Sequence, residues 1–336
     1  MSYKKVVLNE FGAPEVLKVV EENTLPEPGP GEVRVKVLAA SAIFTDTMVR
    51  KGIYYGFKET PPLSPGYDMV GLVDKLGSGN AGLEISQMVA DLTVFGAYTE
   101  YMIRPANSLV PVPEGLDPAE AVSMVLSYVT AYQMLHRVAE VRPGQKILVH
   151  GAGGAVGTAL IELGALHGLE IHGTASSAKH DLVRSLGAAP IDYHKEDFEF
   201  KMQKIGGVDA AFDAISGENF KRSFKSLKKG GILVPYGFYN QAQGRGGNVA
   251  LDFTKVVLWN MLPNGRRTSF YSIGALRDKN PEWFREDLGA LFELLQAGRI
   301  KPSIERRMKL EDAREAHELI ENAAVKGRIV LEMVEG

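Results

Sequence analysis

The sequence Lys146-Ile-Leu-Val-His150 is followed directly by Gly151-Ala-Gly-Gly-Ala-Val-Gly157. An apolar strand that runs into a glycine turn and then a helix builds a phosphate site, because the helix N-terminus presents unpaired N–H groups and about half a positive charge. Glycines let a pyrophosphate approach without meeting Cβ atoms. The stretch therefore predicts a dinucleotide site, with contacts from Gly151, Ala152, Gly154, Ala155, Val156 and Gly157.

The spacing of these glycines departs slightly from the usual dinucleotide pattern. Ala152, Gly154 and Gly157 match G-x-G-x-x-G only if alanine is accepted at the first position, and a plain tight turn is the alternative. The surrounding sequence favours the dinucleotide site. Residues 158–167 continue as a helix and residues 170–175 have the pattern of the next parallel strand, which completes the βαβ unit that the motif requires.

The end of that second strand indicates which dinucleotide is preferred. NAD enzymes usually place Asp or Glu there, roughly 20 residues after the glycines, to bind the ribose hydroxyls. This chain instead has Ala175, followed by Ser176, Ser177 and Lys179, whose hydroxyls and cation suit a 2′-phosphate. We therefore expect NADPH rather than NADH. The alternative is that the two serines only cap the next helix.

Length and composition limit the remaining possibilities. A chain of 336 residues with 45% hydrophobic content exceeds one typical core, so two domains are expected. The net charge of −3 and the lack of a polybasic run argue against a nucleic acid or an anionic membrane surface as partner. No signal peptide and no membrane span are recognised, so a cytoplasmic protein is expected. The absence of cysteine removes disulfides, thiolate nucleophiles and cysteine-ligated zinc.

The secondary-structure pattern changes along the chain. Residues 1–120 are rich in short β-branched runs and turn signals, typical of a partly open β-barrel. Strand and helix then alternate, which indicates a doubly wound parallel sheet in an α/β fold. After about Pro263 two amphipathic helices precede a closing strand. We expect a catalytic β-barrel domain at residues 1–120, a Rossmann dinucleotide-binding domain at 121–262 and the rest of the catalytic domain at 263–336.

Five segments occur along the chain in a recognisable order: Phe11–Leu17, Asp46–Tyr54, Thr130–Tyr132, Val141–His150 with the glycine turn, and Gly327–Leu331. In this order they resemble the zinc-independent branch of the medium-chain dehydrogenase/reductases, which includes quinone oxidoreductases and enone or enoyl-thioester reductases. The resemblance covers nearly the whole chain. It implies a GroES-like barrel and C-terminal tail forming one lobe, a Rossmann sheet forming the other, and an active site in the cleft.

The resemblance also bears on metal use. Zinc-dependent relatives commonly carry Gly-His-Glu where this chain has Gly66-Tyr67-Asp68, and tyrosine does not replace imidazole as a ligand. The histidines are scattered without zinc-site spacing, so no metal is expected. The remaining chemistry is hydride transfer from NADPH to a small-molecule quinone or to an alkene conjugated to a carbonyl, which needs no Lewis acid.

The family's Gly-x-Tyr motif places Tyr54 in the catalytic role, as a phenol that steadies the developing anion. Tyr55 is the competing candidate, and both rings acting only as walls of the site is the alternative. Ile43 replaces an asparagine that many relatives carry near the nicotinamide, which makes the expected pocket drier.

The resemblance implies further cofactor contacts, each of which has a packing or surface role as its alternative. They are Thr130 at the carboxamide, Ser177, Lys179 and Tyr193 around the adenosine ribose, Gly237 and Phe238 at a strand end, and Arg328 in the tail. Ser176 beside them, and Arg245 in a glycine-rich loop that could touch the phosphates, are added from the sequence itself.

Two other functions and an assembly remain to be tested. The chain could be a low-turnover NADPH-binding protein, similar to lens crystallin or vesicle-associated relatives. It could instead reduce enoyl thioesters of coenzyme A or a carrier protein, with Lys51, Lys58 and Arg104 as a basic rim. Relatives pair through an edge strand, and the apolar run Leu258–Pro263 favours a homodimer.

Overall fold

The computed structural model describes residues 1–79 and 82–333 and divides into two compact units. Unit 1 comprises Met1–Leu126 and Leu288–Gly336, and unit 2 comprises Ser127–Asp287. Of the helices among the described residues, none has both the length and the hydropathy that crossing a bilayer requires. Each unit is built around its own sheet.

Unit 2 contains a parallel sheet whose six strands, among the described residues, have the order β10-β9-β8-β11-β12-β13. This order reverses between β8 and β11, and ligands of doubly wound sheets bind beside the carboxyl ends of the strands at such a point. The strands are β8 (Lys146–His150), β9 (Glu170–Ala175), β10 (Ala189–Asp192), β11 (Val208–Asp213), β12 (Leu227–Pro235) and β13 (Arg267–Thr268).

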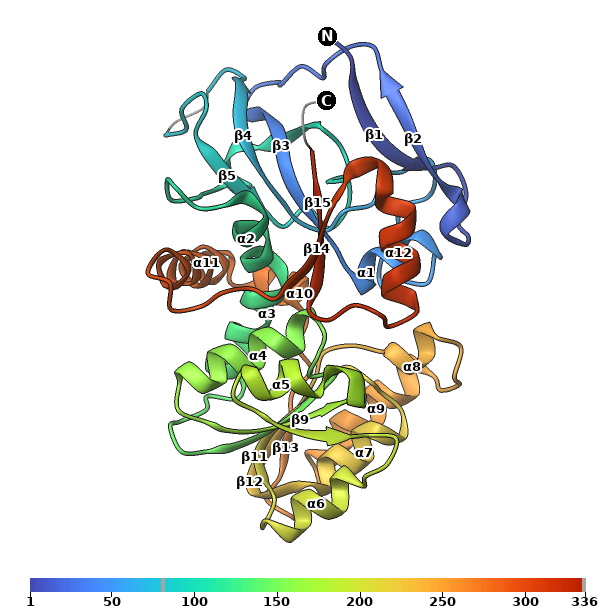
Figure 1. Cartoon of the computed structure of the whole chain (residues 1–336), viewed down its shortest axis with the longest axis vertical. Helices are drawn as coiled ribbons and strands as arrows, with labels where there is room; N and C mark the ends of the chain where they lie inside the picture. The colour runs from blue at the N-terminus through green and yellow to red at the C-terminus, as the bar shows by residue number, and fades with distance from the viewer. Residues whose placement is uncertain (80–81, 334–336) are drawn as a thin grey trace. The chain divides into compact units, whose positions relative to one another are not determined.

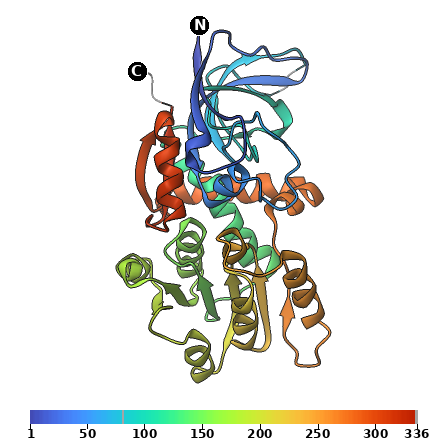
Figure 2. The same cartoon turned by 90° about the vertical axis from the view of Figure 1, so that its right-hand side faces the viewer.

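Helices cover both faces of this sheet (Figures 1 and 2). The central strands are continuous apolar runs because they are buried on both faces, and Ile147, Leu148 and Val149 of β8 have no exposed surface. The helices of unit 2 are α3 (Val129–Gln133), α4 (Ala155–Leu166), α5 (His180–Ser185), α6 (Phe198–Lys204), α7 (Glu218–Lys225), α8 (Tyr239–Ala242), α9 (Val249–Trp259), α10 (Ile273–Lys279) and the first part of α11 (Pro281–Gln296).

Unit 1 is mainly antiparallel. Within the described part of the chain its sheet has the order β14-β15-β3-β4-β5-β7, and β6 pairs with β3. The long strand β3 alternates buried and part-exposed side chains before becoming fully buried, so one face supplies the core. The strands are β3 (Glu32–Ala42), β4 (Met69–Leu76), β5 (Met88–Asp91), β6 (Tyr101–Pro105), β7 (Val110–Pro111), β14 (Ile304–Lys309) and β15 (Arg328–Glu332).

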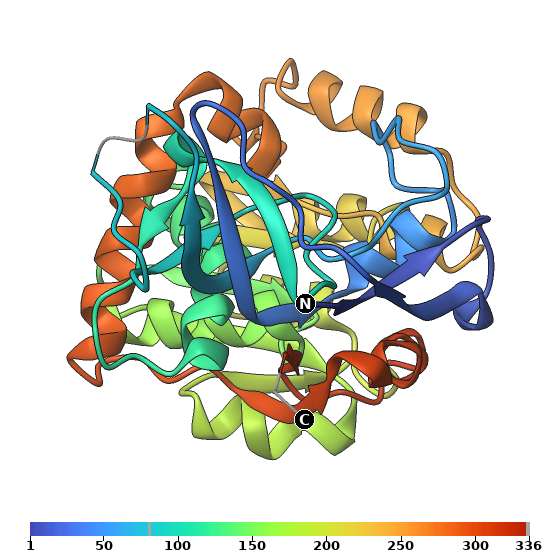
Figure 3. The same ribbon diagram turned by 90° about the horizontal axis from the view of Figure 1, so that it is seen from above.

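A separate hairpin, the second part of α11 and further helices complete the described part of unit 1. The hairpin of β1 (Tyr3–Leu8) and β2 (Leu17–Glu22) lies beside α1 (Figure 3), and its loop is tied to the end of that helix by the Gly12 N–H, which donates to the Arg50 carbonyl at 3.0 Å. The further helices are α1 (Phe44–Arg50), α2 (Pro118–Ser123) and α12 (Ala313–Glu321). The predicted fold class, a doubly wound parallel sheet plus a partly open β-barrel, is confirmed.

The unit boundaries differ from the sequence expectation of 120/121 and 262/263. They fall at 126/127 and 287/288, so residues 263–287 belong with the parallel sheet. Strand β13 pairs with β12, the Tyr271 hydroxyl donates to Gln133 Oε1 at 2.8 Å, and Gln133 Nε2 donates to Asp287 at 2.8 Å. These buried bonds attach residues 263–287 to unit 2. The pattern of apolar residues alone did not reveal this attachment.

Candidate functional site

The glycine turn joins β8 to α4 at the point where the strand order of unit 2 reverses. Gly151 has φ +66°, a left-handed conformation that favours glycine, and its carbonyl accepts from the Gly154 N–H at 2.9 Å. A Cβ added at Gly157 would lie 2.2 Å from the Gly151 oxygen, so a side chain there is excluded. The turn thus brings the backbone against the first turn of α4, whose N–H groups point toward an incoming anion.

Lys179 lies over this turn. A Cβ added at Gly153 would sit 2.6 Å from Lys179 Cδ and 2.9 Å from Lys179 Cβ, so the lysine stem occupies the space that a side chain would need. The predicted lysine and the predicted glycine turn are therefore brought together by the fold.

The two serines after β9 do not act as helix caps. Ser176 precedes a short 3₁₀ turn, Ser177–Lys179, without a capping side-chain bond, and the exposed Ser177 donates to Asp192 Oδ2 at 2.5 Å. Asp192 also pairs with Lys195 at 3.6 Å. The hydrogen bond from Ser177, followed by the one from the His194 N–H, lowers the pKa of Asp192, so this carboxylate stays ionised.

Tyr193 follows β10 and is 53% exposed. Burial of part of its ring raises the pKa of Tyr193, and the neighbouring Tyr239 phenol raises it further. Arg245 lies over the Tyr239 ring with 5.7 Å between the guanidinium carbon and the ring centroid. Tyr193, Tyr239 and Arg245 thus form a group of accessible aromatic and cationic side chains in unit 2, of which sequence reasoning missed Tyr239.

The other predicted cofactor residues of unit 2 lie in its interior or at strand ends. Thr130 is 6% exposed in α3. Gly237 follows the end of β12, where an added Cβ would contact Ala214 at 3.0 Å. Phe238 stacks on Phe270 with 5.8 Å between ring centroids, so it takes part in packing. A cofactor role for these residues stays a prediction.

A buried polar network supports the strand ends beneath the turn, and sequence reasoning missed it. His150 at the end of β8 contacts Thr174 Oγ1 through Nδ1 and Ser223 Oγ through Nε2, each at 2.9 Å. Ser223 donates to Asp213 Oδ2 at 2.6 Å. Burial lowers the pKa of His150, so the ring is neutral. The network links β8, β9, β11 and α7 and holds the turn in place.

In unit 1, Tyr54 rather than Tyr55 occupies the enclosed position. The Tyr54 and Tyr67 hydroxyls lie 2.8 Å apart and the rings meet edge to face at 6.0 Å, whereas Tyr55 is 76% exposed. The ring centroid of Phe57 lies 6.4 Å from that of Tyr54 and 5.6 Å from that of Phe95. We call this series of rings, Tyr67, Tyr54, Phe57 and Phe95, the aromatic row.

A buried carboxyl group lies behind the aromatic row. Asp46 accepts from the N–H groups of Ile43 at 3.1 Å and Gly66 at 3.2 Å, and from the Tyr98 hydroxyl at 3.0 Å. Burial raises the pKa of Asp46 to about 8, although these hydrogen bonds favour the ionised form. Asp46 is therefore mainly protonated at neutral pH. Tyr98 also contacts His317 Nε2 at 3.3 Å.

Arg328 lies in the interior of unit 1, and its predicted contact with the cofactor stays a prediction. Arg328 lies in β15, is 2% exposed and donates from Nη1 to the Ser123 carbonyl at 2.7 Å. Arg328 pairs with Ile304 of β14, and the next residues of β15 pair with β3, so the guanidinium is enclosed and bonded within unit 1. Two residues of the basic rim are also engaged, because Lys51 pairs with Glu321 at 2.7 Å and Arg104 with Asp91 at 2.6 Å.

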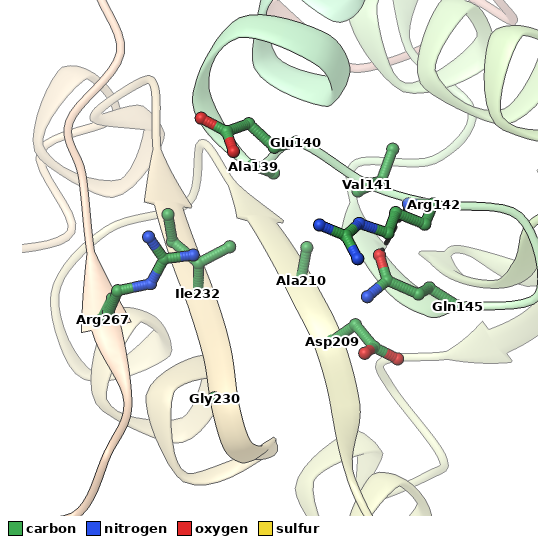
Figure 4. Close-up of a pocket in the computed structure, with 10 residues that line it drawn as sticks. All are labelled: Ala139, Glu140, Val141, Arg142, Gln145, Asp209, Ala210, Gly230, Ile232 and Arg267. Carbon is green, nitrogen blue, oxygen red and sulfur yellow. Dashed lines mark hydrogen bonds between the residues drawn. The ribbon is translucent and has the colours of Figure 1, made fainter.

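A cavity of about 170 Å³ lies at the amino-terminal ends of β8, β11 and β13, whereas the glycine turn follows the carboxyl end of β8. Figure 4 shows Arg142 and Arg267 reaching toward it from opposite sides of Ala210 and Ile232. Because it is at the amino-terminal edge of the strands, this cavity is separate from the glycine turn.

Comparisons with known proteins agree on one family. Residues 29–114 match the alcohol dehydrogenase GroES-like domain, and residues 186–331 match the family described as zinc-binding dehydrogenase. The quinone oxidoreductase of Rattus norvegicus is 30% identical over 96% of this chain and 95% of its own. The synaptic vesicle membrane protein VAT-1 homolog of Homo sapiens is 30% identical over 97% of this chain and 85% of its own.

A solved structure, Escherichia coli quinone oxidoreductase complexed with NADPH, superposes with a TM-score of 0.86 at 25% identity, covering 98% of this chain and 100% of the other. Although one matching family is described as zinc-binding, the residues of this chain do not fit that metal. The sequence has no cysteine, Asp68 accepts from the Ser41 N–H at 2.9 Å, and no group of three metal-ligating side chains is found within residues 1–79 and 82–333.

Proposed function

Because this chain belongs to the zinc-independent medium-chain dehydrogenase/reductases, we propose that it is an NADPH-dependent oxidoreductase whose substrate is a quinone or a carbonyl-conjugated alkene. The observation that carries the cofactor assignment is the seating of Lys179 on Gly153 beside the glycine turn. It supports a site that offers backbone N–H groups to the pyrophosphate and a cation to the 2′-phosphate.

The chain's residues divide the binding of NADPH among them. Gly157 lets the turn pack closely on α4, and the pyrophosphate would lie at the N-terminus of that helix beside Gly151 and Gly154. Lys179 would contact the 2′-phosphate, with Ser176 and Ser177 beside it. Tyr193 would border the adenosine, together with Tyr239 and Arg245. β9 itself ends without the acidic residue that binds ribose hydroxyls in NAD enzymes, although the ionised Asp192 after β10 holds the Ser177 hydroxyl, so Lys179 has to supply the attraction for a 2′-phosphate.

When bound, NADPH supplies a hydride, two electrons with one hydrogen nucleus, and the reduced substrate then gains one proton. Carbonyl conjugation already polarises a quinone or enone, so the protein needs only to orient it, exclude water and stabilise an oxygen anion. Tyr54 offers the hydroxyl that would donate to this anion. The aromatic row provides flat apolar surfaces suited to a planar conjugated substrate.

The enoyl-thioester alternative has less support. A coenzyme A or carrier-bound substrate brings phosphates that need accessible cations, and Lys51 and Arg104 already form ion pairs with Glu321 and Asp91. A low-turnover binding protein remains an alternative because similarity to the VAT-1 homolog is as high as similarity to quinone oxidoreductase.

One set of measurements separates these functions. Calorimetry with NADPH and NADH tests the site, and NADPH consumption is then followed with 1,4-benzoquinone, an alkenal and crotonyl-CoA in parallel. We expect tighter binding of NADPH and turnover of the quinone or the alkenal. NADPH binding without any turnover would favour the binding protein, turnover of crotonyl-CoA alone would favour the thioester reductase, and no binding of either coenzyme would overturn the proposal.

We also propose a homodimer that forms at the β13 edge of the parallel sheet. β13 pairs with β12 on one side, and the adjacent α9 and its following loop expose a series of apolar side chains. A sedimentation mass of one chain at micromolar concentration would contradict this assembly. The exposed residues are Leu251, Phe253, Val257, Leu258, Met261 and Leu262.

A further inference from the structure

The pair of tyrosines in unit 1 has a geometry that a simple aromatic wall does not require. Tyr67 is only 4% exposed, and its hydroxyl meets the hydroxyl of the less buried Tyr54 at 2.8 Å. In such a contact one phenol donates its proton and the other accepts it. Which of them donates determines what the Tyr54 proton is free to do.

If Tyr67 donates, the Tyr54 oxygen accepts one hydrogen bond and its own O–H remains available to a third group. A bond donated to the Tyr54 oxygen also stabilises the phenolate that forms when the Tyr54 proton leaves. If Tyr54 donates instead, its proton is held by Tyr67 and unavailable. Only the first arrangement makes Tyr54 a useful acid.

We propose that Tyr67 is a positioning residue, which holds the Tyr54 hydroxyl and donates to its oxygen, so that Tyr54 gives its proton to the substrate oxygen. This inference rests on the proposed function, because it assumes that a conjugated carbonyl compound is reduced. It deepens that function by assigning a role to a residue that stands where zinc-dependent relatives commonly have a metal ligand.

The proton step balances as follows. Addition of hydride to the conjugated carbon shifts the C=C electron pair toward the carbonyl carbon and the C=O π pair onto the carbonyl oxygen. The Tyr54 O–H bond breaks, its proton joins that oxygen to give an enol or hydroquinone, and the Tyr54 phenolate keeps the electron pair. The Tyr67 O–H stabilises this phenolate until water returns a proton to it, and an enol then becomes the saturated carbonyl compound by tautomerisation.

The groups that act on Tyr54 give the pair a defined pH behaviour. Burial raises the pKa of Tyr54, the hydrogen bond with Tyr67 lowers it, and Asp46 raises it when ionised. Phe57, the other ring beside Tyr54, carries no charge. Removal of the Tyr67 hydroxyl should therefore raise the pKa of Tyr54 and weaken it as an acid.

The decisive variant is Tyr67→Phe, which removes one oxygen and keeps the ring. With wild-type enzyme that turns over a quinone or an alkenal, we expect kcat to fall by about threefold to tenfold, as the loss of one hydrogen bond implies. The KM for NADPH should stay unchanged, and the alkaline limb of the kcat profile should move to higher pH. Tyr55→Phe is the matched control and should leave all three quantities unchanged.

A double variant tests whether the two hydroxyls act together. Tyr54→Phe should lower kcat more than Tyr67→Phe, and the Tyr54→Phe, Tyr67→Phe double variant should equal Tyr54→Phe alone. Additive losses, or a Tyr67→Phe enzyme with wild-type kcat and an unmoved alkaline limb, would overturn the inference while leaving the proposed function intact.

If the protein reduces none of the tested substrates, the proposed function fails. A measurement without cofactor then still tests the inference. Ultraviolet difference titration of tyrosinate assigns the pKa of Tyr54 by comparing wild type with Tyr54→Phe. That pKa should be higher in Tyr67→Phe. If Tyr67→Phe does not fold, titration of Tyr54→Phe still tests the direction of the hydrogen bond. Loss of the Tyr54 oxygen as acceptor should lower the pKa of Tyr67. A raised pKa of Tyr67 would mean that Tyr54 is the donor and would overturn the inference.

Discussion

Replacing Lys179 with methionine removes its charge but keeps a long side chain that can remain on Gly153. In the proposed site the ammonium contacts the 2′-phosphate of NADPH, a group that NADH lacks. A hydrogen bond to a charged group is worth about 1.5 to 3 kcal/mol. The Kd for NADPH should therefore rise by about 10-fold to 150-fold, while the Kd for NADH should change little.

The contact between Lys179 and Gly153 explains why this lysine should matter more than an ordinary surface lysine. Its stem already lies against the turn, with Cδ 2.6 Å from the position of an added Gly153 Cβ. Ordering a long side chain usually costs free energy on binding, and a side chain that is already placed loses less. Added salt should reduce the difference between NADPH and NADH, since the contact is electrostatic.

Calorimetric titration of both coenzymes into Lys179→Met and wild type measures the difference directly. Lys146→Met is the matched control, because Lys146 lies at the amino-terminal end of β8 and the glycine turn follows the other end of that strand. It should leave both affinities unchanged. An equal loss of affinity for NADPH and NADH in Lys179→Met would show that the lysine does not read the 2′-phosphate and would refute the reasoning.

Three further substitutions test the geometry. Gly157→Ala puts a Cβ 2.2 Å from the Gly151 oxygen, so thermal unfolding should show a stability loss of about 1 to 3 kcal/mol. Calorimetry should show weaker binding of both coenzymes. Wild-type stability and affinities would contradict the close approach of the two backbone segments. Asp46 has a folded-state pKa of about 8, above its ordinary 3.8, so it binds a proton that the unfolded chain has lost and stability should fall as pH rises from about 4 to 8. Denaturant titrations should show this slope reduced in Asp46→Asn, and an unchanged slope would assign it to other groups. Arg328→Met should cost about 1.5 to 3 kcal/mol of stability by removing the bond to Ser123 and leave the preference for NADPH unaltered, whereas loss of that preference would restore the phosphate role.

The glycine turn and the parallel sheet were predictable because their signals are local. The strand, the turn and the start of α4 are contiguous in sequence, and apolar runs separated by helices specify a parallel sheet. Lys179 could be placed near the turn because it follows the next strand of the same βαβ unit. The spacing within such a unit is short enough that the chain has few other ways to connect.

The parts that sequence reasoning missed depend on contacts between distant segments. Ser223 meets His150 across 73 positions, and no local pattern marks a serine in α7 as the partner of a strand-end histidine. The burial of Arg328 was not foreseen because a Gly-Arg pair in a tail resembles an accessible loop, whereas this residue begins β15 and pairs with β14. Tyr67 was noted only as a residue that cannot bind zinc, since its contact with Tyr54 depends on the path of the chain after α1.

The alanine that breaks the dinucleotide pattern has a structural explanation in the neighbouring strand. Ala152 is fully buried, and its N–H donates to the Thr174 carbonyl at 3.0 Å, which holds it against β9. The residue opposite is Gly173, where an added Cβ would lie only 2.7 Å from the Ala152 Cβ. The methyl group of Ala152 therefore fills space that Gly173 leaves open, and it points into the sheet instead of toward the pyrophosphate. Glycine is needed where the backbone approaches the ligand or another backbone, as at Gly157, and the first position of this turn no longer has that requirement because the strand beside it supplies the room.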